Sequence, residues 1–220
     1  MEIAFDELAK ADLVVDGVYR GGEAGNYGDD PLDKILRCGN MGGFRIVGSA
    51  MGPAYKLVAL YTTFGDPDWP GELDPTARGF SYYGDNKDPG RELHETPKGG
   101  NQLLRHCFDA IHVVPPRRRS VPPFFVFSKV GRGRDVRFHG LAAPGAPGMP
   151  EVEDLVAVWK TKGSERFQNY RAAFTILNAP QIERRWIDAI LAGDPFTPFA
   201  PNAWIAWVEH ESYQKLVVSS

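Results

Sequence analysis

Short strand-like runs, separated by turns rich in glycine and proline, dominate this sequence. The 220 residues include 24 Gly and 18 Pro, and aromatic residues make up 12% of the chain. Glycine and proline interrupt helices, whereas aromatic and β-branched residues favour strands. The composition therefore favours a β-rich scaffold over a helical bundle, and the length suits one domain.

The strand-like runs are spread along the whole chain. They lie at residues 13–22, 42–48, 56–64, 79–84, 124–130, 135–142, 155–160 and 170–177, with a last one within 202–210. The runs 124–130 and 135–142 flank the tight turn "GRGR", which predicts a hairpin.

Three segments carry helix signals. Residues 29–38 begin with acids and Pro31, residues 101–112 begin with Asn101 as a candidate N-cap, and residues 181–193 end in a glycine. We therefore expect an α+β fold, in which a curved, barrel-like sheet with flanking helices forms a single domain over residues 1–220.

The chain shows no sign of a membrane or secreted protein. No stretch approaches 18 apolar residues, and no signal peptide precedes the first apolar run. Cys38 and Cys107 are the only cysteines, and they are not spaced as a metal pair. We expect two buried thiols in a cytoplasmic protein, with no bound metal and no cofactor.

Familiar catalytic motifs are missing from the sequence. It contains no P-loop, no GxGxxG after a strand, no HExxH, no CxxC and no GxSxG. One enzymatic alternative stays open, namely a small hydrolase that holds a metal between Asp66, Asp68 and His94. Metal-dependent turnover would distinguish it from a binding module.

Aromatic and acidic side chains gather where two strand-like runs end. One run ends at Phe64 and continues into an acidic loop, and the other ends in "SYYGD". A flat base between aromatic rings gains about 1–3 kcal/mol, and a carboxylate can accept from the amine of cytosine. Packed core rings are the alternative. Neighbouring strand residues face opposite ways, so we expect Tyr82 rather than Tyr83 to line a pocket. The candidate pocket residues are Phe64, Asp66, Asp68, Trp69, Tyr82 and Asp85.

Positive charge is concentrated in the middle of the chain. Residues 91–139 hold ten Lys or Arg against four Asp or Glu, a local +6, whereas the remainder carries 15 against 24, or −9. Such a segment is typical of a surface that binds a polyanion, although an ordinary solvated surface would look the same. The candidate phosphate contacts are Arg117, Arg118, Arg119, Lys129, Arg132, Arg134 and Arg137.

These motifs, in this order, resemble a known family. The stretch "KLVALYTTFGDPDWPGELDPTARGFSYYGDNK", followed by "GGNQLLRHC", is similar to the SET-and-RING-associated (SRA) domain, which binds methylated cytosine by base flipping. It is more similar still to the N-terminal recognition domains of AspBHI-like and MspJI-like modification-dependent restriction endonucleases. "RFQNYRAAFTIL", "RRWIDAIL" and "PNAWIAWV" extend the likeness over roughly residues 10–208.

The resemblance implies roles for particular residues. In "FSYYG", Tyr82 takes the place of the tyrosine that stacks on the flipped base. Phe64 stands where the family carries its first pocket aromatic, usually a tyrosine, and Asp66 or Asp68 stands for the acid that binds the cytosine edge. Asn101 matches an asparagine that opens the next helix. The loop 85–100 stands where the family has a finger, but it lacks the usual finger residues.

The resemblance also implies a function and partners. The chain is expected to be a recognition module, not an enzyme on its own, that flips a modified cytosine, with 5-methylcytosine preferred, out of double-stranded DNA. The nuclease of such systems lies in a C-terminal or separate domain, which we do not find here. A reader of 5-hydroxymethylcytosine or phosphorothioate DNA is the alternative.

Overall fold

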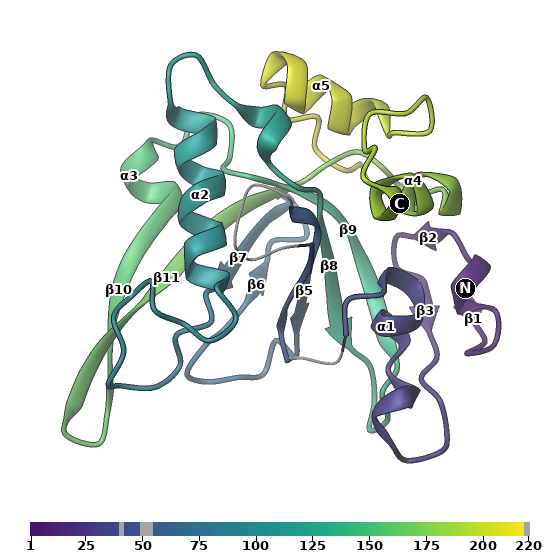
Figure 1. Ribbon diagram of the computed structural model, residues 1–220, viewed down its shortest axis with the longest axis horizontal. Coiled ribbons are helices and arrows are strands. Elements are labelled where there is room, and N and C mark those ends of the chain that lie inside the picture. The colour runs from purple at the N-terminus through teal and green to yellow at the C-terminus, as the bar shows by residue number, and fades with distance from the viewer. Residues whose placement is uncertain (40–41, 49–54, 218–220) are drawn as a thin grey trace.

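A large mixed sheet with flanking helices forms the molecule (Figure 1). The computed structural model describes residues 1–39, 42–48 and 55–217, so the rest of the expected 1–220 domain lies outside the described residues. The fold is α+β, as the sequence predicts.

The strands of the described residues are β1 (Glu2–Ile3), β2 (Leu13–Val14), β3 (Val18–Tyr19), β4 (Phe44–Gly48), β5 (Tyr55–Thr62), β6 (Glu72–Leu73), β7 (Gly79–Tyr83), β8 (Phe124–Lys129), β9 (Val136–Pro144), β10 (Leu155–Lys162), β11 (Glu165–Ile176) and β12 (Gln181–Ile182). The α-helices are α1 (Pro31–Leu36), α2 (Gly100–His112), α3 (Glu151–Asp154), α4 (Arg184–Ala192) and α5 (Asn202–His210).

The sheet is open. Its strands follow the order β4-β5-β8-β9-β11-β7-β6, with β10 paired to β11 and with β3 joining β1 to β9. Within the described residues no ladder joins β4 to β6, so the sheet is not closed into a barrel and the barrel-like shape is not confirmed. β5 and β8 are parallel, with Thr62 opposite Ser128.

Helices cover both faces of the sheet at β8. Phe124 contacts Phe174 of β11, which in turn meets Phe108 of α2. The next residue, Phe125, points the other way and contacts Trp186 of α4. This explains why Phe124–Phe127 is a continuous apolar run without alternation, because both faces are buried.

Three parts of the sequence-based assignment are wrong. Residues 202–210 form helix α5 instead of a last strand, and Trp204 and Trp207 of this helix are fully buried. Helix α2 begins at Gly100 with Gly99 as its N-cap, so Asn101 is not the cap. The predicted helix 181–193 starts later, at Arg184, because Gln181–Ile182 pairs with β2.

Both cysteines are buried and carry free thiols. Burial raises the pKa of Cys38 to about 12, so this thiol stays protonated. In the part of the chain that the structure describes, no helix is long and apolar enough to span a membrane.

Candidate functional site

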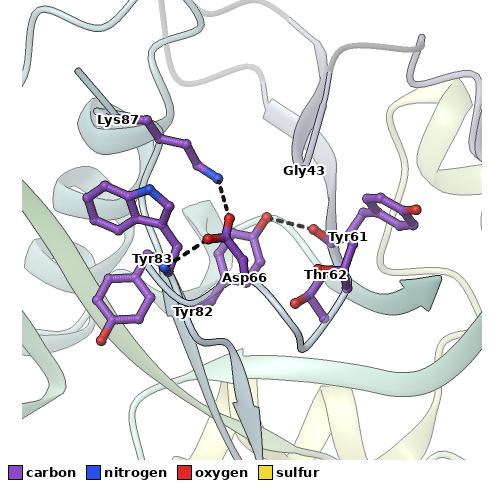
Figure 2. A pocket seen from close by; sticks show the side chains of 9 residues that line it. Gly43, Tyr61, Thr62, Asp66, Tyr82, Tyr83 and Lys87 are labelled. Carbon is purple, nitrogen blue, oxygen red and sulfur yellow. Dashed lines mark hydrogen bonds and ion pairs between the residues drawn. The ribbon is translucent and has the colours of Figure 1, made fainter. Parts of the chain in front are cut away.

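A small cavity lies where the end of β5 approaches the end of β7 (Figure 2). Its volume is about 150 Å³. We call it the tyrosine cavity. Its lining comes from β5 and the acidic loop after it, from β7, and from the segments beside them, namely Gly43, Tyr61, Thr62, Thr63, Asp66, Trp69, Tyr82, Tyr83 and Lys87.

Tyr82 forms the inner wall of the tyrosine cavity. Its side chain is 8% exposed, and its hydroxyl donates a hydrogen bond of 3.0 Å to the carbonyl of Tyr61. Burial raises the pKa of Tyr82, so the hydroxyl remains a donor. A Cβ atom at Gly43 would lie 2.6 Å from this hydroxyl, so only glycine fits there.

Tyr83 and Trp69 form the outer wall. Their rings meet edge to face, with centroids 5.5 Å apart, and both are partly exposed. The ammonium group of Lys160, on β10, lies 5.0 Å from the Trp69 ring and 5.6 Å from the Tyr83 ring. Both tyrosines therefore line the cavity, and the expectation that only Tyr82 does so is wrong. Tyr83 is the last residue of β7.

Of the two candidate acids, Asp66 lines the tyrosine cavity and Asp68 does not. Asp66 Oδ1 accepts hydrogen bonds from the amides of Asp68 and Trp69, at 3.1 and 3.2 Å. Its second oxygen lies 3.8 Å from Lys87 Nζ. Figure 2 marks this ion pair with a dashed line. The loop conformation therefore holds Asp66 at the cavity, whereas Asp68 is exposed.

Phe64 does not line the tyrosine cavity. Its backbone adopts a positive φ of 57°, and its ring packs edge-on against His139 of β9, 5.4 Å away. Burial lowers the pKa of His139 to about 4, so the imidazole under Phe64 is neutral at neutral pH. The Phe64 ring thus lies on the β8–β9 side of the loop.

Asp85 is engaged in fixing the start of helix α2. Its carboxylate accepts hydrogen bonds from the amides of Gly100 and Asn101, at 3.0 and 2.9 Å. Asn101 accepts in return from the Asp85 amide, at 3.2 Å, and is fully buried. This reciprocal pair ties the exit of β7 to α2, and it leaves the Asp85 carboxylate bound to the helix.

A second cavity, which we call the lysine cavity, adjoins the first. Its volume is about 300 Å³, and it shares Gly43, Tyr82 and Lys87 with the tyrosine cavity. The remainder of its described lining is Gly42, Phe44, Gly84, Asp85, Arg91, Pro97 and Lys98.

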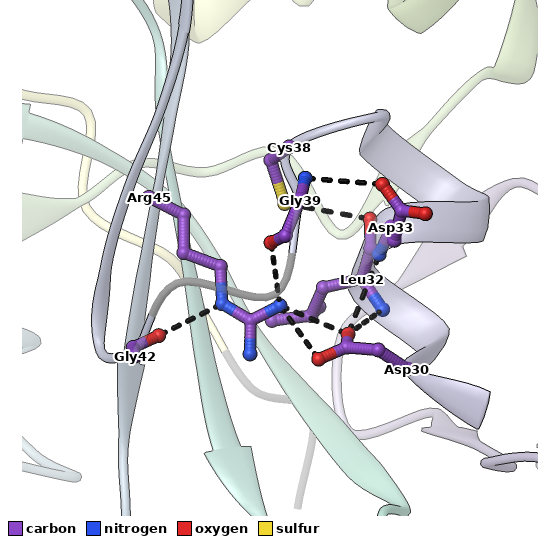
Figure 3. A network of polar contacts seen from close by, with 7 residues as sticks. All are labelled: Asp30, Leu32, Asp33, Cys38, Gly39, Gly42 and Arg45. Carbon is purple, nitrogen blue, oxygen red and sulfur yellow. Dashed lines mark hydrogen bonds and ion pairs between the residues drawn. The ribbon is translucent and has the colours of Figure 1, made fainter. Parts of the chain in front are cut away.

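A buried ion pair holds the glycine segment beside the two cavities (Figure 3). Arg45 Nη1 lies 2.8 and 2.9 Å from the two oxygens of Asp30, which also caps α1. Arg45 Nε donates to the carbonyl of Gly42, at 2.8 Å. The pair thus anchors the Gly42–Gly43 segment to helix α1.

The predicted basic residues fall into two groups. Because β5 and β8 are parallel, the acidic loop after Thr62 and the basic turn after Lys129 leave the sheet at the same end. Lys129, Arg132, Arg134 and Arg137 belong to this end. The other three arginines precede β8, at its opposite end.

Two of the three arginines at this opposite end form ion pairs with other residues of the protein. Arg118 is 12% exposed in its side chain and pairs with Glu211, and Arg119 pairs with Glu209. Arg117 is exposed. The predicted residues therefore do not form one continuous basic surface beside the cavities.

The structure does not assemble the metal site of the hydrolase alternative. His94 contacts the hydroxyl of Tyr170 at 2.8 Å, and Asp66 binds loop amides. Among the described residues, no group of three or more His, Cys, Asp or Glu side chains could hold a metal ion.

Sequence reasoning missed Lys87, Lys160 and the Gly42–Gly43 pair. Lys87 stands in the same turn as Asp85, and Lys160 directly follows the apolar run of residues 155–159, so both carried a signal. The glycine pair could be read as a turn, but its place beside Tyr82 depends on a contact between distant segments.

Comparison with known proteins places this arrangement in a family. Residues 13–219 match the family model described as the N-terminal domain of restriction endonuclease AspBHI. A search of curated proteins gives no match.

Solved structures agree with the family model. The DNA recognition domain of the cytosine modification-dependent restriction endonuclease LpnPI is 45% identical, with a TM-score of 0.90, over 100% of this chain and 97% of that one. The DNA modification-dependent restriction endonuclease AspBHI is 42% identical, with a TM-score of 0.91, over 100% of this chain and 56% of that one.

A more distant match shares the fold alone. The MspJI restriction endonuclease in complex with a 27-mer oligonucleotide is 22% identical, with a TM-score of 0.67, over 95% of this chain and 55% of that one. The family model and the two stronger matches cover nearly the whole sequence. The chain therefore belongs to the family of the AspBHI restriction endonuclease N-terminal domain, and it is homologous to DNA recognition domains of modification-dependent restriction endonucleases.

Proposed function

We propose that this protein is a DNA recognition module that takes a modified cytosine, 5-methylcytosine in the first instance, out of the duplex and holds it in the tyrosine cavity. The observation that carries the proposal is the meeting of an acid, Asp66, with the rings of Trp69, Tyr82 and Tyr83 around one cavity. The homology to recognition domains supports DNA as the ligand.

Stacking supplies the affinity for the base. Trp69 and Tyr83 are the partly exposed rings at the cavity, so a flipped base meets them first, and stacking on such a ring contributes about 1–3 kcal/mol. Tyr82 is buried and forms the inner wall against which the base rests. These contacts offset the unstacking cost of a few kcal/mol.

Asp66 is the residue we assign to the base edge. Its carboxylate accepts from the exocyclic amine of cytosine, and it disfavours thymine, whose O4 is also an acceptor. The loop amides of Asp68 and Trp69 fix Asp66 in this position before the base arrives. Such preorganisation reduces the ordering cost of binding.

The methyl group itself supplies a small part of the discrimination. One buried methylene-sized group is worth about 0.8 kcal/mol, which is a factor of about four in affinity. The carboxylate does not add to this, because cytosine and methylcytosine present the same amine edge. A preference for methylcytosine much above fourfold therefore requires that the cavity stabilise plain cytosine poorly.

The test is a binding panel of matched duplexes that differ only at one cytosine. The panel carries cytosine, 5-methylcytosine, 5-hydroxymethylcytosine, thymine, or a phosphorothioate link at that position. We expect tightest binding to 5-methylcytosine, with increased fluorescence of a neighbouring 2-aminopurine as the base leaves the stack. Equal affinity for all duplexes would reject the proposal, and preference for another member of the panel would reassign the mark.

Two acid variants make the panel specific for the cavity. In Asp66→Asn, one side-chain oxygen is still present for the loop amides, but the second is replaced by an amide NH2 group, which donates hydrogen bonds. We expect this variant to bind methylcytosine more weakly and to lose part of its advantage over thymine. Asp68→Asn, two residues away and exposed, is the matched control and should behave as wild type.

We further propose that the protein directs a nuclease to marked DNA, with that nuclease in a C-terminal or separate domain. The AspBHI structure supports this, since this chain corresponds to 56% of that endonuclease.

A further inference from the structure

The lysine cavity has a charge pattern that the reading of a base does not require. Its described lining includes the cations of Lys87, Arg91 and Lys98 against a single carboxylate, that of Asp85. Both oxygens of Asp85 accept amide hydrogen bonds at the start of helix α2, so this negative charge is directed to the helix.

Two of the three cations belong to the lysine cavity alone. Arg91 and Lys98 come from the loop between β7 and α2 and do not line the tyrosine cavity. Lys87 lines both cavities and lies 3.8 Å from Asp66. A neutral base gains little from such a set of cations, whereas an anionic oxygen group gains charge-assisted hydrogen bonds from each of them.

We infer that the lysine cavity is an anion subsite, which binds an anionic oxygen group belonging to the nucleotide held in the tyrosine cavity. This inference rests on the proposed function and deepens it. The shared wall of Gly43, Tyr82 and Lys87 makes the two cavities neighbours, so one nucleotide can reach both.

Two groups on a nucleotide have this chemistry. One is a backbone phosphate beside the flipped base, and the other is a carboxylate attached to C5 of the cytosine. A phosphate would serve every duplex, whereas a carboxylate would extend the set of marks that the protein binds.

The decisive variant is Arg91→Gln with Lys98→Gln, because it leaves the lining of the tyrosine cavity intact. Its affinity is compared with wild type on a methylcytosine duplex, on the same duplex with single phosphates near the mark replaced by neutral methylphosphonates, and on a duplex with 5-carboxylcytosine. Arg91→Lys with Lys98→Arg, which keeps both charges, serves as the rescue variant. Lys10→Gln with Lys215→Gln removes two exposed charges that line neither cavity and is the control.

A phosphate in the subsite predicts that one methylphosphonate position weakens wild-type binding by about tenfold but has little further effect on the variant. A carboxylate predicts that wild type binds 5-carboxylcytosine better than methylcytosine and that the variant loses this advantage. The rescue variant should restore either effect.

The inference is overturned if the variant matches wild type on all duplexes and every methylphosphonate effect persists. That outcome is distinct from failure of the proposed function, in which wild type itself would show no preference for a modified duplex.

Discussion

The hydroxyl of Tyr82 donates a hydrogen bond to the main-chain carbonyl of Tyr61, across 3.0 Å. Tyr82 belongs to β7 and Tyr61 to β5, two strands that do not pair in the sheet. This one side chain therefore connects two parts of an open sheet at the wall of the tyrosine cavity. The strand β5 also bonds there to Gly43, whose carbonyl accepts from the Tyr61 amide at 2.7 Å.

Tyr82→Phe tests this connection. The variant keeps the ring but removes the donor, and a net hydrogen bond of this kind is worth about 1 kcal/mol. We expect the free energy of unfolding, measured in urea, to fall by about that amount. Binding to a methylcytosine duplex should weaken as well, because the cavity wall loses its tie to β5. Unchanged stability would show that this bond contributes nothing to the fold.

The two neighbouring tyrosines should separate stability from binding. Tyr82 is buried, and truncating such an aromatic residue to alanine typically costs about 3–5 kcal/mol of folding stability. Tyr83 and Trp69 are partly exposed at the cavity, so Tyr83→Ala and Trp69→Ala should each lose about 1–3 kcal/mol of binding to methylcytosine DNA. Tyr83→Ala and Trp69→Ala should both remain folded, with a melting temperature near that of wild type. If Tyr83→Ala binds as well as wild type, the base does not stack on this ring.

The alternation of side chains along a strand explains which features of the tyrosine cavity could be predicted from the sequence and which could not. It correctly makes Tyr82 and Tyr83 face opposite ways, and the runs at β5, β7 and β8 were found within a few residues. It cannot show that both rings border one cavity together with Gly43. That encounter depends on contacts between distant segments, and a local pattern contains no information on them.

The mistaken last strand has a different cause. The segment "NAWIAWVEH" is short and rich in tryptophan and β-branched residues, which favours a strand by composition. Its buried positions, Trp204, Trp207 and Val208, follow the spacing of a helix face. This face is buried in part by packing of Trp204 against Trp186 of α4, with ring centroids 6.2 Å apart.

The two basic groups should differ in their effect on the salt dependence of binding. Each phosphate contact adds about −0.9 to the slope of log affinity against log salt. Changing Lys129, Arg132 and Arg137 to alanine removes cations from the end of the sheet that also carries the acidic loop, so we expect a flatter slope.

The triple change of Arg117, Arg118 and Arg119 to alanine is the contrasting variant. Arg118 and Arg119 are held by Glu211 and Glu209, so this change should alter the slope less than the first. Binding isotherms for both variants between low and moderate salt give the slopes. A flatter slope in the second variant alone would place the duplex at the opposite end of β8.

The pKa of His139 gives the last prediction, which concerns pH. Burial is the largest cause that lowers this pKa to about 4 in the folded protein, and Arg137 lowers it further while Asp16 opposes the shift. The unfolded chain has the ordinary value of about 6.5, so between these values the unfolded state binds more protons. The stability that the neutral His139 contributes is therefore fully present above about pH 6.5. It is lost as pH falls toward 4, by about 3 kcal/mol in all and about 2 kcal/mol by pH 5.

His139→Gln keeps a polar partner for Ser128, which His139 contacts at 2.7 Å, but it does not titrate. Urea unfolding of both proteins at pH 7 and pH 5 isolates the effect, because the other titratable groups change their protonation equally in each protein. We expect wild type to lose about 2 kcal/mol more than the variant between these pH values. Equal losses would mean that His139 is protonated in the folded protein at pH 5, and that the ring beneath Phe64 carries a charge there.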